Sequence, residues 1–136
     1  MIYELEVEGK IVGKERPRVN LYNGIVYTPN KTKDYENYIR ECFAIKYPNY
    51  VPIEGRVSIS IIAYRKIPTN TNKATKEKML NGELSPTTKP DVDNITKAVL
   101  DAMNKIAFAD DNQVCKTIVE KKYSLEEKLY IKIEDY

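Results

Sequence analysis

Acidic residues and one lysine are grouped in a short stretch in the second half of this chain. Lys89-Pro90-Asp91-Val92-Asp93-Asn94-Ile95-Thr96-Lys97 is followed, one helix later, by Asp110-Asp111-Asn112-Gln113. Carboxylates held together repel one another, so they need a cation, a shared proton or a salt bridge. A hard divalent metal such as Mg²⁺, with Mn²⁺ as a substitute, meets this need because it takes oxygen ligands and retains several waters. The segment therefore predicts a metal site suited to phosphate chemistry.

The spacing of these residues would place their side chains around one point. Asp91 and Asp93 are two positions apart, so in extended backbone both project to the same side. Asp93 can cap a helix over residues 94–104, which places Lys97 on the same helical face one turn later. An ammonium there can offset carboxylate charge, hold a phosphate oxygen or stabilise a leaving oxyanion. The pair Asp110-Asp111 follows the helix and could supply a third ligand to a metal that activates water.

The same residues also fit a purely structural explanation. Asp93 is a good helix cap, and Asp93, Lys97 and Asp101 stand four positions apart, as an ion-pair ladder along a helix requires. Asp110-Asp111-Asn112 has the composition that a turn prefers. The acidic pattern alone therefore leaves a metal site and a capped, salt-bridged helix both open.

Basic residues flank the acidic segment in the sequence. Lys14, Arg16 and Arg18 alternate around Pro17, and an arginine fork matches a phosphate group well. Taken singly, most of these cations would be solvated surface charges. Together with the acidic segment they are what cleavage of a polyanion needs, since cations bind the backbone and a metal acts at one phosphate. We expect polyanion contacts from six residues: Lys14, Arg16, Arg18, Lys73, Lys76 and Lys89.

Composition narrows the class of protein. The chain has 136 residues, of which 42% are hydrophobic and 31% charged, so we expect one globular domain over residues 1–136. It has no histidine, which excludes mechanisms that use an imidazole base, nucleophile or metal ligand. No apolar run reaches the roughly 18 residues of a membrane span, so no membrane partner is expected. The isolated Cys42 and Cys115 are expected to be buried, reduced thiols of a cytoplasmic protein.

Apolar periodicity predicts the elements that position these residues. Four segments alternate as strands do: 3–7, 57–66, 114–123 and 129–134. Asn23-Gly24 within residues 18–27 predicts a hairpin, and residues 73–81 fit a short helix. Two main helices are predicted by apolar stripes at helical spacing: Tyr35, Tyr38, Ile39, Cys42 and Ile45 in the first, and Ile95, Val99, Ala102, Met103 and Ile106 in the second. This order predicts an α+β fold, a mixed and mostly antiparallel sheet with two main helices packed on it.

Two separated motifs of the chain resemble those of one protein family. The acidic core of the RusA family of Holliday junction resolvases is similar to Lys89-Pro90-Asp91-Val92-Asp93-Asn94, Lys97, Leu100-Asp101-Ala102 and Asp110-Asp111-Asn112-Gln113-Val114. The opening of that family is similar to Gly13-Lys14-Glu15-Arg16-Pro17-Arg18 and Tyr27-Thr28-Pro29. The resemblance covers nearly the whole chain, and its motifs come in the same order.

The resemblance implies a RusA-like fold and a homodimeric, Mg²⁺-dependent endonuclease that cuts four-way DNA junctions by paired nicks, in DNA recombination and repair. The family's acidic ligands carry over to Asp91, Asp93 and Asp111, with Asp110 as a further candidate ligand, and its essential lysine carries over to Lys97. The basic residues above then become DNA contacts. One departure is that Ala107 and Phe108 stand where the family usually has glycine and tryptophan.

Two other functions remain open from the sequence. The chain could be a non-catalytic DNA-junction-binding protein whose carboxylates are structural. It could also be a nuclease that acts on other branched DNA or on RNA. Cleavage of a four-way junction with Mg²⁺, and competition by linear duplex, would separate these possibilities.

Overall fold

Four strands form the central sheet, in the order β1-β6-β4-β5, in the computed structural model, which describes residues 1–136. Their bounds are Ile2–Glu8 for β1, Val57–Lys66 for β4, Val114–Ser124 for β5 and Lys128–Asp135 for β6. β6 pairs antiparallel with both β1 and β4, whereas β4 and β5 are parallel. The predicted mixed, mostly antiparallel sheet is confirmed, and so are its four main strands.

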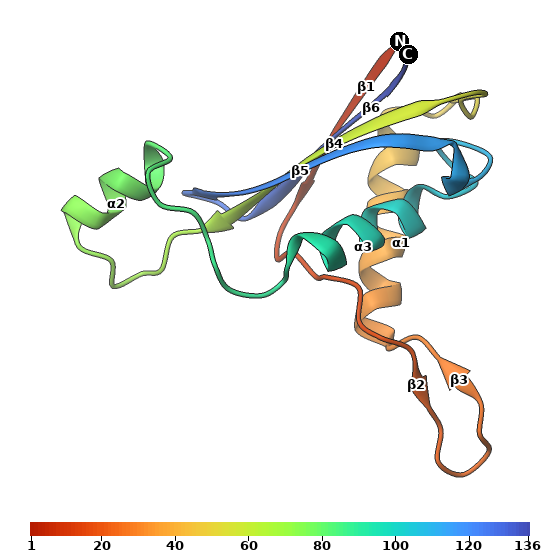
Figure 1. Ribbon diagram of the computed structural model, residues 1–136, viewed down its shortest axis with the longest axis horizontal. Coiled ribbons are helices and arrows are strands. Elements are labelled where there is room, and N and C mark those ends of the chain that lie inside the picture. Colours follow the sequence, from red (N-terminus) through yellow and green to blue (C-terminus); the bar gives the residue numbers. More distant parts are fainter.

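Two helices, α1 (Asn30–Lys46) and α3 (Val92–Met103), contact each other and cover one face of the sheet (Figure 1). The core between these layers is made by alternate strand residues such as Ile59 on β4 and Ile131 on β6 and by Val99 on α3, all fully buried. Each such aliphatic side chain stabilises the fold by about 1.5–3 kcal/mol through burial. The expected α+β class with two main helices is therefore confirmed.

The buried face of α1 differs from the predicted one. Tyr35 and Ile39 are buried as expected, but Tyr38 and Ile45 are exposed, and their place is taken by Glu36 and Phe43. A carboxylate among the buried residues is invisible to an apolar pattern, because its burial depends on a partner from another segment. The stripe predicted for α3 holds along the helix.

Two elements project from the two-layer body (Figure 1). The short α2 (Lys73–Leu80), confirmed close to its predicted bounds, buries none of its residues. The hairpin of β2 (Arg18–Val19) and β3 (Val26–Tyr27) forms as predicted, with Gly24 at φ +68° in its turn. None of the helices combines the length and apolar composition that a membrane span requires.

Candidate active site

The segment that leads from β1 to the hairpin lies directly against the beginning of α3. The backbone N–H of Lys14 donates to the carbonyl of Asn94 at 2.9 Å. A Cβ at Gly13 would lie 2.7 Å from Cβ of Pro90 and 3.0 Å from Cβ of Asn94, closer than real contacts allow. Glycine is therefore required at residue 13 for this close approach, which brings the basic segment next to the acidic one.

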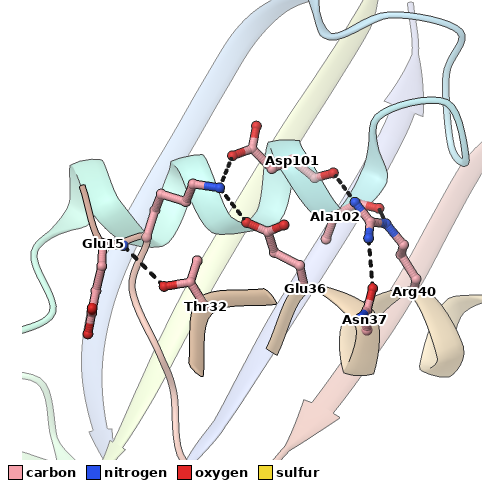
Figure 2. Close-up of polar contacts among 8 residues, drawn as sticks. Glu15, Thr32, Glu36, Asn37, Arg40, Asp101 and Ala102 are labelled. Carbon is pink, nitrogen blue, oxygen red and sulfur yellow. Dashed lines mark hydrogen bonds and ion pairs between the residues drawn. The ribbon is translucent and has the colours of Figure 1, made fainter. Parts of the chain in front are cut away.

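Lys14 makes ionic contacts with both α1 and α3. Its Nζ lies 2.8 Å from Oε1 of Glu36 on α1 and 3.0 Å from Oδ2 of Asp101 on α3, and Figure 2 shows these two carboxylates on the facing helices. Burial alone lowers the pKa of Lys14, but the two carboxylates outweigh it and raise that pKa above its ordinary value. With both partners in place, Lys14 joins α1 to α3, and it also lines the grooves beside the start of α3, so its role as a DNA contact stays a prediction.

Arg40 of α1 closes the other end of this helix contact (Figure 2). Its Nε donates to the carbonyl of Ala102 at 2.9 Å, and its Nη2 donates to the carbonyl of Asp101 at 2.8 Å. The last carbonyls of a helix have no partner within the helix, so a cation there both fills their hydrogen bonds and suits the helix dipole. The position of α3, which carries the acidic residues, is thus fixed from α1.

The helix α3 starts two residues earlier than predicted. Asp91, not Asp93, is its N-cap, and Oδ1 of Asp91 accepts a hydrogen bond from the N–H of Asn94 at 2.9 Å. Asp93 lies in the first turn, so the argument from extended backbone does not apply to this pair. Both carboxylates are exposed at the N-terminal end of the helix.

The adjacent aspartates Asp110 and Asp111 have different roles. Asp110 caps a short 3₁₀ turn, η1 (Asp111–Gln113): its Oδ1 accepts from the N–H of Asn112 at 2.8 Å, while its own N–H donates to the side chain of Gln113 at 3.0 Å. Asp111 lines a groove together with Lys97 and Asp101. The hydrogen-bonded Asp110 raises the pKa of Asp111 above its ordinary value, and the charge of Asp101 adds to this.

A groove of about 860 Å³ runs over the start of α3 and is bordered by the basic segment. Among its lining residues are seven predicted ones: Lys14, Arg16, Arg18, Lys89, Asp91, Asp93 and Lys97. A neighbouring groove of about 420 Å³ shares Lys14, Arg16 and Lys97 and adds Asp101 and Asp111. The structure thus brings together most of the predicted site residues. Lys73 and Lys76, on the projecting α2, line neither groove.

The ion-pair ladder along α3 does not form. Asp101 pairs with Lys14, and Lys97 takes part in no ion pair with any carboxylate. Lys97 is exposed and lines both grooves, the larger one with Asp91 and Asp93 and the smaller one with Asp111. The structural explanation of the acidic pattern therefore accounts for the cap at Asp91 but not for Lys97.

No three carboxylates lie close enough to form a ready metal-binding cluster. Mg²⁺, however, is commonly held by one or two carboxylates together with waters and substrate phosphates. The candidate donors Asp91, Asp93 and Asp111 are all carboxylates, whose oxygens are the ligands that a hard cation prefers. The residues therefore fit a hard cation held by few protein ligands, and do not form an enclosed cage.

Sequence reasoning did not identify several residues that build this site. Glu36 was not recognised, although a glutamate beside Tyr35 and Ile39 on a helical stripe is a signal of a buried ion pair. Arg65 lies at the end of β4, as the strand pattern predicts, and it also lines the larger groove together with Lys10. Neither residue belongs to a local motif, so only the packing of distant segments shows its place.

Comparison with known proteins identifies the family of this chain. The profile of the family described as "Endodeoxyribonuclease RusA" matches residues 8–134, nearly the whole chain. The chain is also 38% identical over 133 residues to the "Uncharacterized protein YqaN" of Bacillus subtilis (strain 168), an alignment that covers 95% of this chain and 93% of that protein. The protein therefore belongs to the RusA family of endodeoxyribonucleases.

Proposed function

We propose that this protein is a Mg²⁺-dependent, structure-selective endodeoxyribonuclease that resolves four-way DNA junctions by paired nicks. The observation that carries the proposal is one groove lined by Asp91 and Asp93 together with several cations, among them Lys97, which takes part in no ion pair. Acidic groups alone would repel DNA, and cations alone would only bind it. Their combination suits cutting of a phosphodiester bond.

Asp91, Asp93 and Asp111 are the candidate ligands, of which one or two would hold the metal together with waters and the substrate phosphate. When bound, Mg²⁺ would supply an activated water and offset charge on the phosphate. Asp110 is a less suitable ligand, because its Oδ1 is already the acceptor that caps η1. Lys97 can donate to a phosphate oxygen and stabilise the negative charge that grows as the bond breaks.

Arg16 and Arg18 would bind the DNA backbone at the rim of the groove. Both are exposed, and the ion pair of Arg18 with Glu15, 3.3 Å long, is itself at the surface, where such pairs are weak. Lys89 extends this basic rim toward Asp91. These cations would supply affinity that does not depend on sequence, leaving selectivity to the shape of the branched substrate.

We also propose that the active form is a homodimer. A four-way junction has approximate twofold symmetry and needs two cuts, and two copies related by a twofold axis present two identical sites. Light scattering coupled to gel filtration would measure the mass in solution. A monomer that nonetheless makes both cuts in one binding event would contradict this part of the proposal.

The central experiment compares Asp111→Asn with Asp110→Asn in the cleavage of a synthetic four-way junction with Mg²⁺. The two variants are matched, since they differ only in which of two adjacent carboxylates is neutralised. Asparagine still caps a helical turn, so Asp110→Asn should retain most activity. Asp111→Asn should lose cleavage and keep junction binding, because it removes negative charge that faces the phosphates.

The same assay separates the alternatives. If the parent binds the junction but never cuts it with Mg²⁺ or Mn²⁺, the protein is a binder and the metal-dependent reaction is wrong. If linear duplex, flaps or RNA compete equally for cleavage, the enzyme is a nuclease of broader choice. If Asp110→Asn is inactive and Asp111→Asn is active, the assignment of the ligand is reversed.

A further inference from the structure

Arg65 has a guanidinium group whose hydrogen-bonding capacity the protein does not fully use. Its Nη1 lies 3.3 Å from Oε2 of Glu127, yet this atom is buried and has no hydrogen-bond partner in the protein. Only 19% of the side chain is exposed. A buried charged donor without a partner is rare in a folded protein and calls for an explanation.

Glu127 forms an ion pair with Arg65 but accepts no hydrogen bond from its guanidinium group. Oε2 of Glu127 accepts a hydrogen bond from the N–H of Ile11 at 2.8 Å, and its carbonyl accepts one from Gly9 at 3.0 Å. A glutamate that served Arg65 alone would take the bidentate geometry in which two N–H groups point at two oxygens. Here the carboxylate is shared with the backbone that follows β1. The buried Nη1 faces this carboxylate, while Nε and Nη2 of Arg65 donate no hydrogen bond within the protein.

A second unpaired donor lies in the same region. The hydroxyl of Tyr35 on α1 is buried and has no hydrogen-bond partner. Burial raises the pKa of Tyr35 well above its ordinary value, and the charge of Glu127 raises it further while Arg65 opposes this. The hydroxyl is therefore neutral and can donate. Two unused donors around one carboxylate leave this region short of acceptors.

A ligand bound in the larger groove would supply the hydrogen-bond acceptor that Arg65 lacks within the protein. Arg65 lines the groove that also contains Asp91, Asp93 and Lys97. Lys10 is exposed and shares with Arg65 the lining of that groove and of a smaller one beside the turn at Glu127. The ligand whose geometry matches an arginine fork supported by a lysine is a phosphate group.

We propose that Arg65, together with Lys10, binds a backbone phosphate of the DNA strand that lies in the groove, distinct from the phosphate that is cut. Glu127 is a positioning residue that aims the guanidinium. This inference rests on the proposed function, because it requires DNA in the groove. It assigns to the end of β4 a second anchoring point that fixes the register of the strand relative to the acidic residues.

The test measures the salt dependence of binding to a fluorescent four-way DNA junction, in EDTA so that no cleavage occurs. Each phosphate contact that is lost lowers the slope of log K against log[salt] by about 0.9. Arg65→Gln and Lys10→Gln should each show this loss, and Arg65→Lys should retain most of the slope. Lys10 is exposed, so its replacement should leave the fold unchanged. Thermal unfolding of each variant confirms that it is folded at the assay temperature.

The matched control is Arg56→Gln. Arg56 precedes the opposite end of the same strand and lies over the ring of Tyr136, 4.2 Å from its centroid, so its slope should equal that of the parent. A parent that does not bind the junction overturns the proposed function and this inference with it. A parent that binds and cuts, with folded Arg65→Gln and Lys10→Gln variants that keep the slope of Arg56→Gln, overturns this inference alone.

A scan with neutral methylphosphonates at single positions of the junction gives an independent readout. The parent should lose affinity at one position to which Arg65→Gln, or Lys10→Gln if the arginine variant fails to fold, is insensitive. Identical position profiles for the parent and the variant would overturn the proposed contact.

Discussion

Replacement of Lys14 by methionine should destabilise the protein far more than loss of a surface charge. Methionine keeps the apolar stem but removes the ammonium that lies 2.8 Å from Glu36 and 3.0 Å from Asp101. The side chain of Glu36 is only 9% exposed, so its charge would be left buried without a cation. The helices α1 and α3 would lose the ionic contact that joins them.

The size of the effect follows from burial. Removing one partner of a buried ion pair costs about 3–5 kcal/mol. The contact with Asp101 adds about 1 kcal/mol or less, since 39% of that side chain is exposed and water screens it. Because the lysine is itself partly exposed, we expect a total near the lower figure, about 3 kcal/mol. For a chain of this length that corresponds to a fall in Tm of roughly 10 °C.

Urea unfolding of Lys14→Met, Glu36→Gln and the double variant is the assay. The double variant leaves no buried charge without a partner, so it should regain more than half of the loss and give a clear coupling energy. A loss below about 1 kcal/mol for Lys14→Met would refute the reasoning. So would a double variant as unstable as the sum of the single ones.

The ion pairs of Lys14 also predict how the stability of the protein changes with pH. The pKa of Lys14 is raised in the folded state above its ordinary value of 10.5. Its contribution is therefore fully present below that pH and is lost as the pH rises through the folded pKa. Lys14→Met should remove this part of the alkaline loss of stability. An identical alkaline profile for parent and variant would contradict the ion pair.

Three further predictions concern backbone and thiol chemistry. Gly13→Ala should destabilise the protein by about 1–3 kcal/mol in urea, because its Cβ would meet Pro90 at 2.7 Å; unchanged unfolding would contradict the close approach. Lys105→Gly should stabilise it by about 0.5–1 kcal/mol, since residue 105 has φ +66°; a lower Tm would contradict this. Cys115 is exposed and should react with a thiol reagent in the native protein much faster than Cys42, which is half-buried with a pKa raised by burial; equal rates would contradict the placement of the two thiols.

The fold was largely predictable because its strongest signals are local. Alternation identified β1 and β4, and helical spacing identified the buried face of α3. Cys115 shows where such signals end: the thiol was expected to be buried, but β5 is an edge strand of the sheet and the side chain is exposed. Strand order is a non-local property, so alternation alone does not say how well a strand is covered.

The site was predictable as a set of residues and less so as an arrangement. Asp91, Asp93 and Lys97 line one groove because they share a single stretch of chain. The roles of Lys14 and Arg65 depend on carboxylates far away in sequence, Glu36 and Glu127, and no spacing rule connects them. A lysine in a basic segment looks like a nucleic-acid contact until its partners are known.

The parallel pairing of β4 with β5 affects the order in which the site assembles during folding. Asp91, Asp93, Lys97 and Asp111 all lie in the single connection, residues 67–113, that joins these two strands. Such a pairing closes a long loop and forms late in folding, because the entropy of closure is lost before the contact is gained. The grooves that gather these residues with Arg16 and Arg18 are therefore expected to form only after β4 and β5 have paired.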